Sequence, residues 1–511
     1  MSDDSYERER DAEQLRMLQP AIDAFAAGYK KGRPTVILLP GGIGSCLRRA
    51  DQPFNDGFNY ETLWIDTDVV LWELPFLQMD GDIDYQRKFM ICDGPVLVQI
   101  PQHDPWVTVA PYNRFIDWIS GPGPDKCNCN SFVFGWDWRR RLDYGARFFG
   151  KKFLPALRTA VLESPAGLDP LEDFTVVAHS MGGLLLKLWL NDDDDGLVRR
   201  VKHAVSVGTP FYGYGGQIHR YFAGMPMLEP LCPKGAENTA KIIASMDGLY
   251  ALFFLPEDIW KRDLDALRHD KDYPICDYPS LDFENYQQGR KVPADPFSPG
   301  SCGDLVRYPK SRKWFHSDQL QNAKSLLEEI TARLPVATAP KFHNWRGVQT
   351  GRHDVPLKDT CWSQTWKWIH PGFIPGKNVD PIQDIGGAGD DTIPAWSARL
   401  TTTPDENVCT FKGSAVAIQH MFLMENADVL KELKHLITPH EPIGAEPDTI
   451  LGTPDPIARS EEIPPFLAAI RHTMRKADGQ PSTDIANTIL KEFDPAKVSA
   501  IVRRILADLV R

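Results

Sequence analysis

The chain has 511 residues and a formal net charge of −12 at pH 7, with 42% hydrophobic and 25% charged residues. This composition is typical of a folded globular protein and excludes extended disorder over most of the chain. The acidic balance argues against a general attraction to nucleic acid or to an anionic membrane surface, because both need a basic face on the protein.

The cysteines and the N-terminus bear on the compartment. Nine cysteines are scattered without regular spacing, as in a reduced intracellular protein rather than a disulfide scaffold. The polar N-terminus lacks the apolar core and cleavage site of a secretory signal, and the chain has no run of 18 apolar residues. We therefore expect a cytoplasmic protein without a transmembrane segment; export without a cleaved signal is the alternative.

The first half of the chain predicts an α/β sheet. A helix is expected over residues 5–30, interrupted at Pro20. Residues 36–39 are a continuous apolar tetrad bounded by prolines, as in a strand buried on both faces. Because strands and helices alternate, we expect a doubly wound, mostly parallel sheet with further strands at 132–135, 174–178 and 204–207 and a helix at 151–162.

After residue 210 this alternation stops. An irregular, aromatic segment, with helices near 240–270 and 317–334, predicts a large inserted cap. Strands at 341–347 and 408–412 and a helix at 421–436 then complete the sheet, before a linker and a C-terminal helical extension. The expected organisation is an N-terminal helix (1–32), a first core part (33–210), the cap (211–338), a second core part (339–438), the linker (439–463) and the extension (464–511).

The most informative motif is Ala178-His179-Ser180-Met181-Gly182. It lies between the apolar run 174–177 and a second apolar run over 183–190, so strand, tight turn and helix predict a nucleophile elbow. Small residues flank the serine because the backbone on both sides must approach closely; here Ala178 replaces the first glycine of the usual Gly-x-Ser-x-Gly. The alternative is a surface serine in a chance match.

A nucleophilic serine needs a histidine base and an acid that holds the histidine in the right tautomer. In this architecture both follow the serine, the acid first. We therefore select Asp390, in the glycine-rich loop 386–394, and His420, which follows the last strand and starts the last helix. For Asp390 the alternative is a helix cap or turn residue. The fallback acids are Asp391 and Asp384, and the competing histidines are His343, His353 and His370.

The oxyanion of the transition state needs preorganised N–H donors. Met181 follows the nucleophile, and Gly42 lies in the glycine loop after the first buried strand, so we expect these two donors. For Gly42 the alternatives are a glycine turn that ends the strand, or a phosphate loop, although the Lys-Ser/Thr pair of such a loop is absent.

No metal or cofactor is expected. Cys127 and Cys129 lack two further soft ligands at a comparable spacing, and a surface loop is the expectation there. The acidic run 192–195 lacks the alternating ligands and turn glycine of a calcium loop and is expected to be solvated.

Taken together, the motifs resemble the lecithin:cholesterol acyltransferase and lysosomal phospholipase A2 group of α/β-hydrolases. The resemblance covers roughly residues 33–438 and is strong at the motifs and weak between them. Its motifs, in the order of the family, are Val36-Ile37-Leu38-Leu39-Pro40-Gly41-Gly42-Ile43-Gly44-Ser45, Thr62-Leu63-Trp64-Ile65-Asp66, Trp136-Asp137-Trp138-Arg139, the elbow itself, Val207-Gly208-Thr209-Pro210, Gly389-Asp390-Asp391-Thr392 and Ile418-Gln419-His420.

This resemblance implies an α/β-hydrolase fold, a triad of Ser180, Asp390 and His420, and oxyanion donors at Gly42 and Met181. It also implies a cap that meets lipid and acyl transfer from a phospholipid or other ester to water or an alcohol. The chain departs from the secreted members in one respect: the stretch 63–92 has no cysteine pair for their lid disulfide. The cap is divergent, and the last ~70 residues lie outside the resemblance.

The expected function is hydrolysis of lipid-like carboxylic esters through an acyl-enzyme on Ser180, without a cofactor. Substrate contact, and transient contact with a membrane surface, would involve the cap. Its aromatic residues are suited to an apolar ligand site or equally to the cap's own core. The alternatives are an O-acyltransferase and, from another class, a non-catalytic binding protein on a hydrolase fold. The cap aromatics in question are Phe211, Tyr212, Tyr214, Phe222, Phe253, Phe254 and Trp260.

Overall fold

A six-stranded parallel sheet lies at the centre of the protein. The strands stand in the order β13-β11-β8-β7-β1-β6, and each pairs with its neighbours in parallel. Their bounds are β1 Thr35–Leu39, β6 Asn130–Val133, β7 Phe174–His179, β8 Val201–Val207, β11 Phe342–Thr350 and β13 Val408–Ser414. This computed structural model describes residues 3–53, 60–64, 79, 98–100, 107–109, 112–123, 125–192, 196–213, 241–253, 256, 258–259, 261–263, 280–282, 291–293, 317–335, 338–350, 365–367, 388–390, 392–414, 417–438, 465–466, 493–494, 497 and 501.

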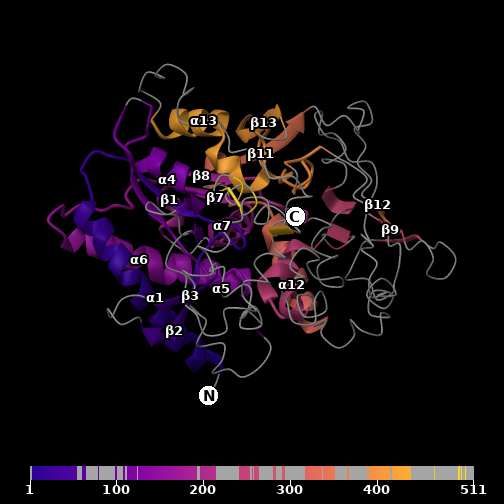
Figure 1. Cartoon of the computed structure of the whole chain (residues 1–511), viewed down its shortest axis with the longest axis horizontal. Helices are drawn as coiled ribbons and strands as arrows, with labels where there is room; N and C mark the ends of the chain where they lie inside the picture. The colour runs from indigo at the N-terminus through magenta and orange to yellow at the C-terminus, as the bar shows by residue number, and fades with distance from the viewer. Residues whose placement is uncertain are drawn as a thin grey trace.

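Helices cover both faces of the sheet (Figure 1). Alternate side chains of a strand point to opposite faces, so Val36 and Leu38 pack in one core cluster and Ile37 and Leu39 in the other. The first face is covered by α4 (Asn113–Ser120) and α13 (Ala427–Ile437). The second is covered by α1 (Asp3–Gly28), α5 (Leu142–Phe148), α6 (Leu154–Glu163), α7 (Met181–Leu190) and α12 (Ser317–Thr331).

This architecture confirms the predicted fold class, an α/β-hydrolase fold with a doubly wound parallel sheet. Every predicted strand of the central sheet is present, although β6 begins two residues before the predicted segment and β8 three residues before it. The predicted helix at 151–162 is the last part of a longer helical run, in which a π-helical turn, Phe149–Phe153, joins α5 to α6.

Two helix predictions need correction. The N-terminal helix is not interrupted at Pro20, because α1 runs through this residue to Gly28. The last helix does not start at His420 as one element. A 3₁₀ turn, His420–Glu425, comes first, and α13 starts after Asn426, whose side chain accepts hydrogen bonds from the N–H groups of Asp428 and Val429. Such a cap satisfies donors at a helix start and so fixes where α13 begins.

The smaller elements were missed by the sequence analysis, as was α4. Most are three-residue pieces, too short for any periodicity of hydrophobic side chains to show. The strands are β2 (Leu47–Pro53), β3 (Tyr60–Trp64), β4 (Val98–Ile100), β5 (Val107–Val109), β9 (Ser280–Asp282), β10 (Lys291–Pro293) and β12 (Thr365–Lys367). The 3₁₀ turns are Val198–Arg200, Ala339–Lys341 and Asp405–Asn407. A further 3₁₀ turn, Asp247–Leu252, lies in the segment near 240–270 where helices are predicted, and α12 lies in the predicted helical segment 317–334.

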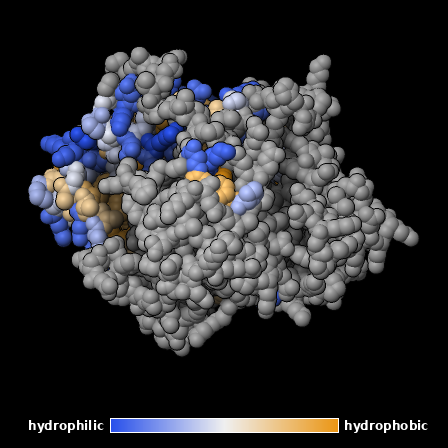
Figure 2. Space-filling view, viewed as in Figure 1, coloured by the Kyte–Doolittle hydropathy of each residue, from blue (hydrophilic) through white to orange (hydrophobic). Residues whose placement is uncertain are grey.

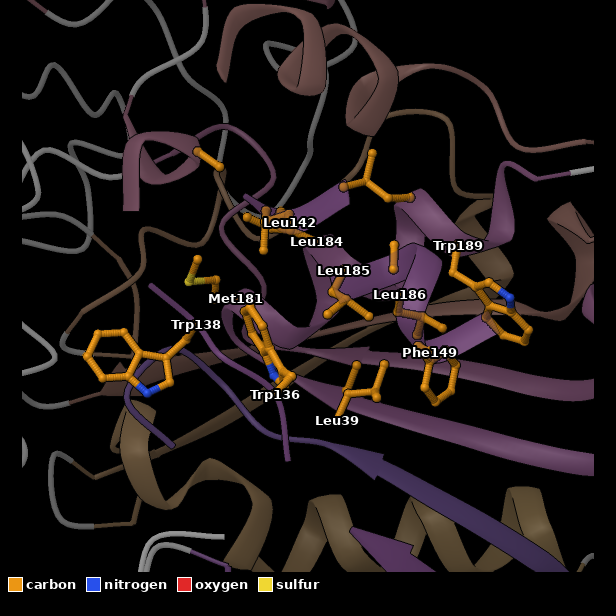
Figure 3. Packing of buried hydrophobic residues seen from close by; sticks show 14 of the residues in the cluster. Leu39, Trp136, Trp138, Leu142, Phe149, Met181, Leu184, Leu185, Leu186 and Trp189 are labelled. Atoms are coloured by element: carbon orange, nitrogen blue, oxygen red, sulfur yellow. The ribbon is translucent and has the colours of Figure 1, made fainter. Parts of the chain in front are cut away.

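The helix after the elbow is the centre of the larger core cluster. All ten residues of α7 are buried, and Figure 3 shows Leu184, Leu185 and Leu186 above Leu39, with Trp136 and Phe149 on either side of Leu39. Even Lys187 is fully buried; its ammonium donates to Asn191 Oδ1 (2.7 Å) and to the carbonyl of Ala332 (2.8 Å). Burial lowers the pKa of Lys187 to about 7. The elbow therefore sits on a rigid, closely packed support.

Described parts of the predicted cap and extension join this same cluster. Phe211, Tyr212 and Phe253 are fully buried in it, and so is Ile501. Tyr212 is also tied by its hydroxyl to Asp263 Oδ2 at 2.8 Å. These three aromatics therefore pack in the core of the protein. The other four cap aromatics lie outside the described residues, namely Tyr214, Phe222, Phe254 and Trp260.

The described surface is mostly hydrophilic in the view of Figure 2, with a small apolar area beside α1 and α6. There, small side chains line a shallow groove between the two helices, among them Ala26, Ala27, Ala156 and Ala160. Among the described residues, no helix is both long enough and apolar enough to cross a bilayer.

A buried ion-pair network fixes the loop after β6. Asp137 accepts from Arg10 of α1 at 2.6 Å and from Arg139 at 2.9 Å, and all three side chains are at most 5% exposed. Burial alone would raise the pKa of Asp137, but Arg139 and Arg10 outweigh it and hold this pKa at about 2. A folded-state pKa below the ordinary value adds stability above pH ~4 that is lost as the pH falls toward 2.

Asp137→Asn should therefore lower the free energy of unfolding by about 3 kcal/mol near pH 7, because it removes the buried carboxylate that pairs with both arginines. The matched control is Asp143→Asn, which breaks the half-exposed pair with Arg141 and should cost less than about 1 kcal/mol. Thermal unfolding followed by circular dichroism from pH 7 to pH 2 measures both. Equal melting temperatures for the two variants would contradict the prediction.

Candidate active site

Ser180 occupies a strained turn between β7 and α7. Its backbone angles are φ 52° and ψ −127°, in the left-handed half of the Ramachandran map that residues other than glycine rarely adopt. The turn is held from both sides: the Ser180 N–H donates to Val207 O, and the Gly183 N–H donates to Ser180 O, each at 2.9 Å. Strand, tight turn and helix are thus present where the sequence predicts them.

Close backbone approach explains the glycine two positions after Ser180. A Cβ at Gly182 would stand 2.5 Å from Pro40 O and 2.6 Å from Leu39 O, both backbone atoms that cannot move aside. Before the serine, Ala178 is fully buried within β7. Any larger residue at position 182 would push the elbow away from β1.

Three side chains from distant parts of the sequence form one hydrogen-bonded chain. Ser180 Oγ lies 2.7 Å from His420 Nε2, and His420 Nδ1 lies 2.7 Å from Asp390 Oδ2. Asp390 follows β11 and His420 follows β13, so both stand at the carboxyl ends of parallel strands, as Ser180 does. The three residues are 8%, 1% and 1% exposed in the order Ser180, His420, Asp390. The structure therefore brings together all three predicted side chains.

The carboxylate of Asp390 has fixed partners on both oxygens. While Oδ2 faces His420, Oδ1 accepts the N–H groups of Ile393 (2.7 Å) and Thr392 (3.3 Å). The backbone closes the arrangement, because the His420 N–H donates to Asp390 O at 2.8 Å. A carboxylate held this way fixes the orientation of the imidazole and the tautomer with hydrogen on Nδ1.

Among the competing histidines and fallback acids, the structure describes His343. It lies near the start of β11, two strands away from β7 and in register with Val205 of β8, and its Nε2 is 3.3 Å from His203 Nδ1. Burial and then His203 lower the pKa of His343 to about 4. The structure thus sets His343 apart from the elbow. Outside the described residues lie His353, His370, Asp384 and Asp391.

The two expected oxyanion donors lie side by side. A Cβ at Gly42 would meet Met181 Sδ at 2.9 Å and Met181 Cβ at 3.5 Å. Within the described residues, neither the Gly42 N–H nor the Met181 N–H has an acceptor. The preceding donor in the loop is engaged, since the Gly41 N–H donates to the Tyr112 hydroxyl at 2.9 Å. This leaves Gly42 and Met181 able to offer N–H groups to a ligand.

Two polar residues that the sequence analysis did not select contact the site. His179 bonds through Nδ1 to Tyr112 Oη and through Nε2 to the carbonyl of His420, each at 2.8 Å. Burial, followed by the nearby His420, holds the pKa of His179 well below its ordinary range, and burial raises the pKa of Tyr112. A signal for His179 was present, since it is a polar residue at the end of an apolar strand; Tyr112 had none.

Metal chemistry has no candidate among the described residues, where no three His, Cys, Asp or Glu side chains gather as a metal site requires. The expectation of a surface loop at Cys127 and Cys129 is wrong: both thiols are buried, at 2% and 3% exposure, in the core cluster beneath α4. Asp192 of the acidic run pairs with Lys151 at 2.8 Å, and residues 193–195 lie outside the described residues.

Comparison with solved structures gives distant similarities. No family model and no curated protein matches the chain. A chain in the crystal structure of the Tle4–Tli4 complex is similar at 14% sequence identity and a TM-score of 0.45, over 81% of this chain and all of that one. Esterase E22 is similar at 13% identity and a TM-score of 0.22, over 79% of this chain and 90% of its own. Neither similarity bears on a substrate, and neither singles out the lecithin:cholesterol acyltransferase group.

Proposed function

We propose that the protein is a serine hydrolase that cleaves carboxylic esters through an acyl-enzyme on Ser180. The observation that carries this proposal is the unbroken hydrogen-bonded chain from Ser180 Oγ through His420 to Asp390, with 2.7 Å at each step. A non-catalytic binding protein has no use for a strained, nearly buried serine aligned with a histidine and a carboxylate. The geometry therefore favours catalysis over a binding protein.

The proposed reaction starts with His420 as base. With the Nδ1 hydrogen donated to Asp390, the Nε2 lone pair accepts the Ser180 proton while Oγ attacks the ester carbonyl carbon. The carbonyl oxygen becomes an oxyanion that the N–H groups of Gly42 and Met181 stabilise. His420 then gives its proton to the leaving alcohol, and the acyl group stays on Ser180. Water repeats these steps, releases the acid and restores the serine.

Lipid-like esters are the proposed substrate class. This part of the proposal rests on the sequence resemblance to the lecithin:cholesterol acyltransferase and lysosomal phospholipase A2 group and on the cap that the sequence predicts within residues 211–338. An alcohol that replaces water in the second half of the reaction would make the same site an O-acyltransferase. Both reactions share the acyl-enzyme and differ only in the acceptor.

The test compares acid release from p-nitrophenyl butyrate and p-nitrophenyl palmitate, with the Ser180→Ala variant as the blank. We expect Ser180-dependent hydrolysis with a higher kcat/KM for palmitate, because a lipid-binding cap adds apolar contacts along the long chain. Turnover of the butyrate ester alone would support the serine hydrolase but contradict lipid-like esters as its substrates. Failure of the folded protein to hydrolyse either ester or to react with a fluorophosphonate would contradict the hydrolase itself.

A further inference from the structure

A buried hydrogen-bonded chain runs beside the triad and has no part in the reaction proposed above. His179, the residue before the nucleophile, is 3% exposed, and Tyr112, just before α4, is 2% exposed. The two rings meet edge to face at 5.7 Å, and the His179 ring lies 4.8 Å from the ring of His420. His179 therefore lies against the proposed base, and Tyr112 lies against His179.

The hydrogens of this chain can be assigned from its acceptors. The carbonyl of His420 can only accept, so His179 Nε2 must carry the hydrogen of the 2.8 Å bond between them. In a neutral imidazole Nδ1 is then an acceptor, and the Tyr112 hydroxyl donates to it. The same hydroxyl oxygen accepts from the Gly41 N–H. One tautomer of neutral His179 satisfies all three bonds.

The two ends of the chain are the base and the oxyanion loop. At one end, the backbone of His420 is held twice: its N–H donates to Asp390 O, and its carbonyl accepts from His179. At the other end, the turn closed by the Gly44 N–H and Gly41 O wraps the Tyr112 hydroxyl so closely that a Cβ at Gly44 would lie 2.9 Å from it. This turn carries Gly42. A shift of Tyr112 would thus move the oxyanion donor and the base together.

We propose that Tyr112 and His179 are positioning residues that hold His420 and the Gly41–Gly44 turn in register with Ser180. The proposal rests on the proposed function, since it concerns the same triad and oxyanion donors. His179 must also be uncharged during the reaction. When His420 becomes a cation during the reaction, a neutral ring at 4.8 Å leaves that charge undisturbed, whereas a cation there would oppose its formation.

The decisive variant is Tyr112→Phe, which keeps the ring and removes the hydroxyl that joins Gly41 to His179. We expect kcat for p-nitrophenyl butyrate to fall about 10- to 100-fold with KM changed less than about threefold, because misplacement rather than lost binding slows the reaction. The matched control is Tyr250→Phe. It removes the hydroxyl of another fully buried tyrosine, which donates to the carbonyl of Ala244 at 2.8 Å, and it should keep kcat.

Variants of His179 test the proposal independently, in case Tyr112→Phe does not fold. His179→Gln can place its amide N–H at the Nε2 position, facing the His420 carbonyl, but has no acceptor at the Nδ1 position that faces Tyr112, whereas His179→Leu loses both groups. We expect kcat in the order wild type, Gln, Leu, at melting temperatures that do not follow this order. Equal kcat for Tyr112→Phe and Tyr250→Phe, or a kcat that simply follows melting temperature across the His179 variants, would overturn the positioning role. Absence of Ser180-dependent turnover in the wild type would instead overturn the proposed function.

Discussion

Replacement of Ser180 by alanine is expected to lower kcat for ester hydrolysis by about 10⁴- to 10⁶-fold, with the fold intact. The change removes the oxygen that faces His420 Nε2 at 2.7 Å across the proposed reaction centre. Alanine keeps the Cβ, so the strain of the positive φ at this position is the same in both proteins. The residual rate comes from the N–H donors of Gly42 and Met181, which the substitution leaves in place.

Covalent labelling measures the same prediction independently of turnover. A fluorophosphonate should label the wild type at Ser180 with one equivalent and should fail to label Ser180→Ala. The matched control is Ser206→Ala, because Ser206 is also fully buried at the carboxyl half of a central strand, where its hydroxyl donates to His343 O. This control should keep labelling and turnover within a few-fold of the wild type. More than a tenth of wild-type turnover in Ser180→Ala would assign the nucleophile elsewhere.

The sheet could be predicted because its strands are buried on both faces. β1 and β7 consist mostly of apolar residues, and every side chain in them is buried, so their pattern does not depend on partners elsewhere in the chain. The parallel arrangement of the strands also predicts where the site residues lie. Loops that follow parallel strands meet at one edge of the sheet. For this reason His420 lies 2.7 Å from Ser180, 240 positions away in the sequence, and 2.7 Å from Asp390, 30 positions away.

The sequence analysis was less successful where a polar group is satisfied by a distant partner. β6 begins at Asn130 rather than at residue 132, because the Asn130 amide accepts from the Lys30 N–H and donates to the carbonyls of Lys30 and Arg33. These bonds join the start of β6 to the connection between α1 and β1, about 100 residues away. No local pattern contains such a partner. Tyr112 could not be selected from the sequence for the same reason, because its proposed role depends on hydrogen bonds to the distant residues Gly41 and His179.

Replacement of Asp390 by asparagine is expected to lower kcat about 10⁴-fold although the two side chains have the same shape. The N–H groups of Ile393 and Thr392 already donate to Oδ1, so they would hold the amide oxygen there and turn the amide NH₂ toward His420 Nδ1. Because this NH₂ can only donate, Nδ1 would have to accept, and the hydrogen would move to Nε2. Nε2 would then face Ser180 Oγ as a donor and could not take its proton.

The Asp390→Asn measurement combines kcat with the melting temperature. The hydrogen bonds of the loop survive the change, so the melting temperature should move little while turnover collapses; this separates a wrong tautomer from a misfolded site. Asp391→Asn and Asp384→Asn are the comparison variants, and both should keep most of the wild-type kcat. If either of them lost turnover while Asp390→Asn kept it, the acid would be that residue, and the 2.7 Å contact between Asp390 and His420 would serve structure alone.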